Sequence, residues 1–381
     1  MGIKYLTSES VCMGHPDKIC DQISDAILDA YLKQDEKARV AVETMVSKDA
    51  VFLAGQITAN ASVDLDVIVR NTLKNIGYGD KDKGMDYKDC VIFKNINAQS
   101  QDIALGVSKD TEDLGSGDQG IMYGYATNET PAFLPMPYYL ANNLVKKLDE
   151  CRRVGKLSWL YPDGKAQVTC AYDENGHMLY VHSVIVSCQH DMTVTLPQLQ
   201  ESILREVILP TIDRQYFHKD TKIHINPTGA FHIGGPEGDT GLTGRKLMVD
   251  TYGGIAKHGG GAFSGKDATK LDRSGAYMAR YVAKNIVAAG LAQKCEVSLS
   301  YCIGCVEPEA VDVDTFGTGI IEDEKIAAIV RETFGFSVKS IIDTLDLRKP
   351  VFEQTAYYGH FADEKYRWEQ CDASRLLSEK R

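Results

Sequence analysis

The sequence predicts an α+β fold built from three repeated helix–strand–strand–helix–strand units. Segments with helical and with alternating hydrophobic spacing follow one another in the same order three times along the chain. A length of 381 residues is enough for two or three such units. Each unit would bury one sheet face under its helices. We therefore expect the units to pack around a pseudo-threefold axis, with their other sheet faces meeting at a dimer interface.

The first unit begins with a helix at 16–34, in which isoleucines recur at helical spacing. A hairpin follows, formed by ARVAVETMVS and VFLAGQIT. Asp64 is suited to cap a second helix near 64–76, because its carboxylate can accept from the first free amides. An apolar run at 90–97 predicts the closing strand.

The same order recurs twice. The second unit has a helix, a hairpin, a helix and a strand at 136–154, 166–188, 196–209 and 222–226. The third unit has a helix, a strand pair, a helix and a strand at 273–290, 295–315, 323–334 and 351–357. These units predict domains at 1–101, 113–233 and 234–371. The segment 99–117, rich in glycine and acidic residues towards its end, is expected to be a mobile lid.

Composition narrows the class of protein. Hydrophobic residues make up 44% and charged residues 25%, as in ordinary globular domains. A formal net charge of −11 argues against nucleic acid as a main partner. No apolar run approaches the roughly 20 residues of a membrane span, and the N-terminal residues do not resemble a secretory signal. Ten scattered cysteines suit a reducing compartment, so we expect a cytoplasmic protein without a membrane partner.

One pair of cysteines has C-x-x-C spacing, at Cys302 and Cys305. The pair stands alone, without a second C-x-x-C or a nearby histidine, so a zinc site is not indicated. It ends the apolar, strand-like run VSLSYCIGC. We therefore expect both side chains to be buried structural thiols.

The segment 228–272 carries the strongest functional signal. Twelve glycines lie between Thr228 and Lys266, interspersed with basic residues. Free backbone amides and lysines together bind polyphosphates. A plain surface loop is the alternative. GGAFSGK at 260–266 fits a P-loop, but Asp267 stands where a P-loop needs a serine or threonine hydroxyl. The sequence thus favours phosphate binding on a different architecture.

A second candidate site lies at the start of the first helix, where residues 14–18 read GHPDK. His15 can donate to a developing oxyanion, Asp17 can bind Mg²⁺ and Lys18 can bind phosphate. Helix capping is the alternative for Asp17. Asp272 offers a further carboxylate beside Lys266 and Lys270. For Glu43, Asp163 and Asp118 a solvated strand or turn position is the alternative to a ligand role.

Several long motifs together resemble one family. GHPDKICDQISDA, GSGDQGIMYGYATNET, GGPEGDTGLTGRKLMVDTYGG and HGGGAFSGKDATKLDRSGAY closely resemble S-adenosylmethionine synthetase, also called methionine adenosyltransferase. The resemblance runs from about Tyr5 to Trp368. It implies three related α+β units and active sites shared across a homodimer interface, with a homotetramer as the alternative assembly.

The resemblance implies a reaction. The sulfur of L-methionine attacks C5′ of ATP and expels tripolyphosphate, which the enzyme then hydrolyses to phosphate and pyrophosphate. The leaving group carries about four to five negative charges, so preorganised cations are the main catalytic requirement. Mg²⁺ and K⁺ are the implied cofactors.

The resemblance also implies roles for individual residues. The implied catalytic residues are His15, Lys18, Lys165, Arg245, Lys246, Lys266 and Lys270. The implied ATP contacts are His15, Asp163, Lys165, Phe231, Asp239, Arg245, Lys246, Ala262, Lys266, Lys270 and Asp272. The implied methionine contacts are Gln56, Gln99, Asp118, Asp239 and Lys270. Asp17 and Asp272 are implied ligands of Mg²⁺, and Glu43 is the implied ligand of K⁺.

One position departs from the family. Its G-E-I-T motif usually carries a glutamate that pairs with the ammonium of methionine, whereas this chain has Gln56. Two other classes of protein stay open on the residues alone. A phosphoryl-transfer enzyme would need the same cations and magnesium, and a catalytically silent regulatory subunit is the non-enzyme alternative, although this chain retains the whole cation set.

Overall fold

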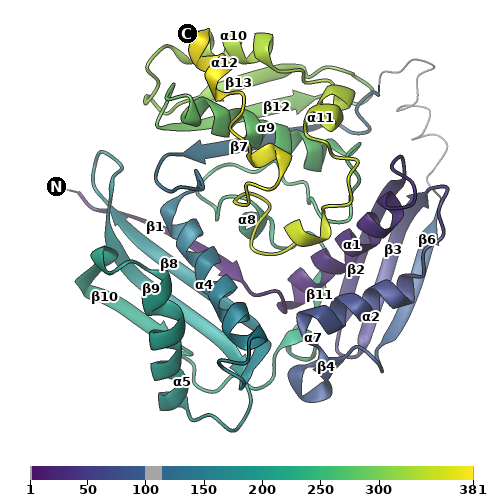
Figure 1. Ribbon diagram of the computed structural model, residues 1–381, viewed down its shortest axis with the longest axis vertical. Coiled ribbons are helices and arrows are strands. Elements are labelled where there is room, and N and C mark those ends of the chain that lie inside the picture. The colour runs from purple at the N-terminus through teal and green to yellow at the C-terminus, as the bar shows by residue number, and fades with distance from the viewer. Residues whose placement is uncertain (1, 99–113, 381) are drawn as a thin grey trace.

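Three antiparallel hairpins lie in three separate sheets of the computed structural model, which describes residues 2–98 and 114–380 (Figure 1). The first pairs β2 (Arg39–Ser47) with β3 (Ala50–Thr58). The second pairs β8 (Leu160–Tyr172) with β9 (Met178–His190). The third pairs β12 (Lys294–Tyr301) with β13 (Ala310–Asp314). The predicted α+β class and its three hairpins are confirmed.

Each hairpin gains an antiparallel neighbour from a distant part of the chain. β1 (Lys4–Val11) pairs with β8, β7 (Gly120–Thr127) pairs with β12, and β11 (Gly241–Leu242) pairs with β2. The exchange is cyclic, because each predicted unit passes one strand to the next sheet. The domain boundaries at 1–101, 113–233 and 234–371 therefore divide the sequence but not the sheets, and the pseudo-threefold axis stays a prediction.

The other side of each hairpin differs among the sheets. β6 (Val91–Asn97) runs parallel to β3, and β10 (Phe217–Ile225) runs parallel to β9. The third sheet has the order β13-β12-β7, and the predicted strand at 351–357 is wrong. The backbone amides of Phe352 and Glu353 donate to the buried carboxylate of Asp29 instead, which holds this segment against α1 (Pro16–Leu32) as a 3₁₀ turn.

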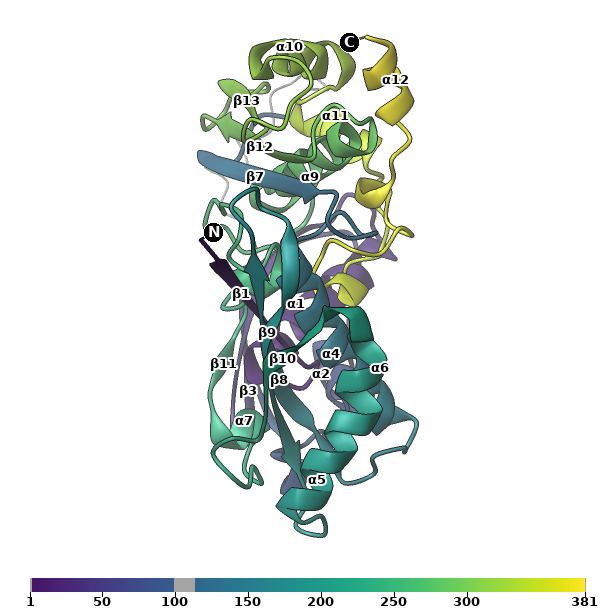
Figure 2. The ribbon, with the colours of Figure 1, turned by 90° about the vertical axis from the view of Figure 1, so that its left-hand side faces the viewer.

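Helices cover one face of each sheet, as Figures 1 and 2 show from two directions. The first sheet carries α1 and α2 (Leu65–Ile76), with Asp64 capping α2 as predicted. The second carries α4 (Met136–Arg153) and α5 (Leu196–Ile203), which continues through a π turn at Leu204–Ile208 into α6 (Leu209–Thr211). The third carries α9 (Leu271–Ala288) and α10 (Asp323–Thr333).

Shorter elements complete the chain. They are β4 (Gly79–Asp80), β5 (Met85–Asp86), α7 (Gly235–Gly238), α8 (Leu247–Asp250), α11 (Val338–Thr344) and α12 (Ser374–Glu379). One hydrophobic core joins the first and third sheets, and a second core lies between α4, α5 and the second sheet. Within the described residues, the search for a helix long and apolar enough to span a membrane finds none.

Candidate active site

Two stretches of the glycine-rich segment 228–272 lie along the open edge of β2. We call 241–246 the first arm and 262–267 the second arm. In the first arm, the Thr243 amide donates to the Thr44 carbonyl at 3.0 Å, next to the β11 pairing. In the second arm, Val42 donates to Gly265 and Asp267 donates to Val40, each at 3.0 Å. Residues 228–272 therefore form neither a P-loop nor a free surface loop. They bring their basic side chains to the first sheet.

His15 is the N-cap of α1, and its ring is almost fully buried. Its Nδ1 accepts from the Asp17 amide at 3.2 Å, so a neutral ring carries its proton on Nε2. Burial, followed by the charges of Lys246 and Lys165, lowers the pKa of His15 to about 3. The ring is therefore neutral near pH 7 and can donate from Nε2 to a developing oxyanion.

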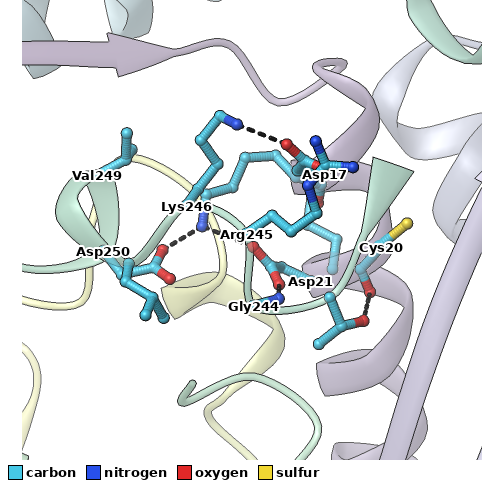
Figure 3. Close-up of polar contacts among 12 residues, drawn as sticks. Asp17, Cys20, Asp21, Gly244, Arg245, Lys246, Val249 and Asp250 are labelled. Carbon is cyan, nitrogen blue, oxygen red and sulfur yellow. Dashed lines mark hydrogen bonds and ion pairs between the residues drawn. The ribbon is translucent and has the colours of Figure 1, made fainter. Parts of the chain in front are cut away.

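Asp17 lies next to the two cations of the first arm, Arg245 and Lys246 (Figure 3). Its Oδ2 accepts from Lys246 Nζ at 2.5 Å, and its Oδ1 lies 3.6 Å from Arg245 Nε. Oδ1 also accepts from the Leu242 amide at 3.0 Å. Burial opposes ionisation of this carboxyl, but Lys246 and the Leu242 amide outweigh burial and lower its pKa. The structure thus brings Asp17, Arg245 and Lys246 together at the start of α1.

Lys18, the next residue, lies in different surroundings. Its side chain is fully buried, and Nζ donates to Asp21 Oδ2 at 2.9 Å and also to Asp250 Oδ1. Burial alone would lower the pKa of Lys18, but the two carboxylates raise it. Lys18 is therefore paired with buried carboxylates, although its charge, like those of Lys246 and Lys165, acts on His15. Neither Asp21 nor Asp250 had a distinguishing signal in the sequence.

A second group of charges lies at the start of α9. Lys266 Nζ donates to Asp272 Oδ2 at 2.8 Å, with the two side chains 25% and 36% exposed. Lys270, the N-cap of α9, donates to the buried carboxylate of Asp267. Asp267 also accepts from the Val40 amide at 2.8 Å. This contact with β2 accounts for an aspartate at the position where a P-loop has a serine or threonine. Lys266 and Asp272 keep a partly open position.

Four predicted residues line one cavity of about 260 Å³ on the uncovered face of the first sheet. Glu43 and Gln56 lie on neighbouring strands and point to this face, and Ala262 and Lys266 border it from the second arm. Thr243 and Ser264 also line it. The Ser264 hydroxyl is buried without a hydrogen-bond partner among the described residues, a feature that sequence reasoning missed.

The second sheet contributes Asp163 and Lys165 next to the same helix start. Gly14 packs so closely on Pro162 that a Cβ at Gly14 would lie 2.3 Å from Pro162 Cβ. Asp163 Oδ2 accepts from the Gly235 amide at 2.9 Å, while its buried Oδ1 lacks a partner among the described residues. Burial raises the pKa of Asp163 to about 6, although the Gly235 amide and Lys165 oppose the change.

The remaining predicted residues are placed less decisively. Asp239 is exposed but close enough to Asp163 to raise its pKa further. Phe231 is half-buried, and its backbone exchanges hydrogen bonds with His190. Asp118 is exposed just before β7. Gln99 and most of the predicted lid at 99–117 lie outside the described residues.

Comparisons with known proteins decide the family. The models of the N-terminal, central and C-terminal domains of S-adenosylmethionine synthetase match residues 4–101, 113–231 and 233–370. The chain is also 55% identical, over 369 residues and 96% of each protein, to S-adenosylmethionine synthase 1 of Rhodospirillum rubrum. The chain belongs to the S-adenosylmethionine synthetase family. The predicted family and its enzyme class, methionine adenosyltransferase, are confirmed.

Proposed function

We propose that this chain makes S-adenosylmethionine from ATP and L-methionine and then hydrolyses the tripolyphosphate to phosphate and pyrophosphate. Membership of the S-adenosylmethionine synthetase family over nearly the whole chain carries the proposal. The grouping of Lys246, Arg245 and His15 at one helix start supports it.

The lysines and the arginine of the site provide the positive charge that a tripolyphosphate leaving group requires. Cations held in place before the reaction stabilise charge that develops in the transition state. Lys246 and Lys165 lie near His15, and Lys266 lies at the start of α9. In this proposal the Nε2 proton of neutral His15 donates to O5′ as the C5′–O5′ bond breaks. Lys270 and Arg245 would hold the outer phosphates, and Lys18 would stabilise the helix that carries His15.

The proposed positions of ATP and methionine follow from the unpaired carboxylate oxygen of Asp163 and from the cavity on the first sheet. The unpartnered Oδ1 of Asp163 would accept from a ribose hydroxyl, with Phe231 near the adenine and Asp239 beside it. The cavity with Gln56 would take the amino-acid part of methionine. Gln99, Asp118 and Asp239 would complete that pocket, and Ala262 would border ATP.

Magnesium and potassium fit the donors only in part. Mg²⁺ takes one or two carboxylates together with substrate phosphates. Asp272 fits, because its side chain is 36% exposed and its partner at 2.8 Å, Lys266 Nζ, is itself partly open to an arriving phosphate. Asp17 would first have to exchange Lys246, because its side chain is only 2% exposed. Glu43 is exposed in the cavity and can offer its carboxylate to K⁺.

The uncovered sheet faces support a homodimer, with a homotetramer as the alternative. On the first sheet Val91 and Phe93 are 53% and 50% exposed, and Phe93 stacks on Phe52. Tyr5 at the second sheet and Ile121 at the third are 48% and 49% exposed. Exposed apolar side chains that lie together on an uncovered sheet face are typical of an interface. A second copy covering the first sheet would also close the cavity at Gln56. The ten free cysteines support a reducing, cytoplasmic location.

Product analysis tests the proposal. The protein is incubated with ATP, L-methionine, Mg²⁺ and K⁺, and the products are identified by mass spectrometry. We expect S-adenosylmethionine with equal amounts of phosphate and pyrophosphate. Omitting methionine is the control. Formation of ADP or AMP with a phosphorylated product would indicate phosphoryl transfer instead, and absence of methionine-dependent turnover would indicate a silent subunit.

A further inference from the structure

The C-x-x-C pair lies in an exposed turn, so the prediction of buried structural thiols is wrong. β12 ends at Tyr301, and Cys302 is exposed while Cys305 is half-buried. The Cys305 amide donates to the Cys302 carbonyl at 3.2 Å, which closes a four-residue turn. Gly304 has φ 77°, as the third residue of a type II turn requires.

The turn has the dimensions of a disulfide. The first and fourth Cα atoms of a β-turn lie within about 7 Å, and disulfides span about 4.4–6.8 Å between Cα atoms. Ile303, between the cysteines, is 64% exposed, so small molecules can reach the turn. The Cys305 thiol donates to Glu309 Oε1 at 3.9 Å. Of the ten cysteines, Cys302 is the exposed one, and every other member is buried or half-buried.

The same turn holds the segment that leads into β7. Gly304 donates to the Ser116 carbonyl at 2.7 Å, and the Ser116 amide donates to the Cys305 carbonyl at 2.8 Å. Tyr301 pairs with Gly120 just beyond this point, so the turn extends the β12–β7 pairing. The state of the two cysteines therefore acts on the backbone groups that bind Ser116.

We propose that Cys302 and Cys305 form a reversible dithiol–disulfide site whose oxidised form holds Ser116 more tightly. The oxidant is a small-molecule disulfide. The Cys302 thiolate attacks one of its sulfurs and releases one thiol, leaving a mixed disulfide. The Cys305 thiolate then attacks the Cys302 sulfur and releases the second thiol. Two protein thiols are oxidised, one small disulfide is reduced, and the two protein protons go to the released thiolates.

Oxidation would stiffen the turn, because a disulfide removes conformational freedom from the loop that it closes. The Gly304 amide and the Cys305 carbonyl would then stay aligned with Ser116. The reduced turn has one backbone bond across it, at 3.2 Å. A disulfide of this kind in a reducing compartment is expected to be transient and redox-sensing.

The test uses the whole protein and oxidised glutathione. Chymotryptic cleavage after Tyr301 and Phe316 yields the peptide 302–316, whose only cysteines are Cys302 and Cys305. In the native, oxidised wild type we expect an internal disulfide in this peptide, reversed by dithiothreitol. Cys302→Ser and Cys305→Ser should lack it, and Cys371→Ser, the change of a half-buried cysteine elsewhere, should form it as wild type does.

Hydrogen exchange tests the second part of the proposal, that the oxidised turn holds Ser116 more tightly. Amide exchange over 114–120 should slow at least threefold on oxidation of wild type and Cys371→Ser, and should not change in Cys302→Ser. A stable glutathione adduct on Cys302 without an internal disulfide would overturn the proposal. A disulfide that leaves exchange over 114–120 unchanged would overturn the link to Ser116.

Discussion

Asp17 and Lys18 are neighbours in the sequence, but they belong to two different charge clusters at the start of α1. The outer cluster joins Asp17 to Lys246 and Arg245, whose side chains are 17% and 50% exposed. The inner cluster joins Lys18 to Asp21 and Asp250, all at most 1% exposed. Cations in the outer cluster can change partner when a polyphosphate arrives. The lysine of the inner cluster cannot do so without leaving buried carboxylates unpaired.

Lys18→Met tests the difference between the two clusters most directly. It leaves Asp21 and Asp250 buried without their cation, and breaking a buried ion pair in this way costs about 3–5 kcal/mol. We expect the free energy of unfolding, measured in urea at equal protomer concentration, to fall by that amount. Lys246→Met is the matched variant of the outer cluster and should lose much less, because Asp17 keeps Arg245 and the Leu242 amide. Equal losses would show that the two clusters do not differ.

Two predicted cations outside both clusters, Lys165 and Lys266, should affect the chemical step instead. Lys165→Met and Lys266→Met each remove one preorganised contact to the leaving group, which is expected to lower kcat by about 10²–10³-fold, or roughly 2.7–4 kcal/mol. Single-turnover rates measure this step. Lys94→Met is the control, because Lys94 and Asp66 form a similarly exposed pair with Nζ–Oδ2 at 2.7 Å. A rate for either variant within threefold of the control would mark these residues as ordinary surface lysines.

The contrast also shows what could be predicted from the sequence. The longer helices and the hairpins follow from local hydrophobic spacing and were predicted, whereas the short helices α7, α8, α11 and α12 were not. The predicted strand at 351–357 failed because its amides bind Asp29, a residue more than 300 positions away. The three exchanged strands were not predicted either, and each pairs with a strand of another unit. GHPDK identified a helix start with useful side chains, but Asp17 and Lys18 differ in their partners, and these partners come largely from 242–250.

The third prediction concerns the charge of His15. Burial, Lys246 and Lys165 keep its folded pKa at about 3, whereas an unfolded histidine titrates near pH 6.5. Between these values the unfolded chain binds more protons, so stability falls as the pH drops below 6.5. From pH 6.5 to pH 5 the loss should be roughly 1.5–2 kcal/mol, at 1.36 kcal/mol per pH unit beyond the midpoint.

His15→Asn is the control for this pH dependence. The asparagine oxygen can still accept from the Asp17 amide at the N-cap, but it does not titrate. Urea unfolding of both proteins between pH 5 and pH 7 measures the difference. Parallel stability curves would mean that His15 has the same pKa in the folded protein as in the unfolded chain, and that burial, Lys246 and Lys165 do not lower it.

The smallest expected effect tests the cavity on the first sheet. Gln56 is exposed there and can meet the methionine ammonium only as a neutral acceptor. A glutamate carboxylate would turn this contact into an ion pair, and at an exposed position an ion pair contributes up to about 1 kcal/mol. Gln56→Glu should therefore lower the KM for methionine by up to about fivefold, the equivalent of that energy, and change the KM for ATP less. Titration of methionine at saturating ATP measures the change.

Asp239 decides how this last result is interpreted, because its exposed carboxylate could already neutralise the ammonium. A second carboxylate at position 56 would then add repulsion instead of affinity, and the KM for methionine would not fall. Titrations of Asp239→Asn and of the double variant separate the two carboxylates. If Gln56→Glu leaves the KM for methionine unchanged in the Asp239→Asn background as well, Gln56 does not face the ammonium.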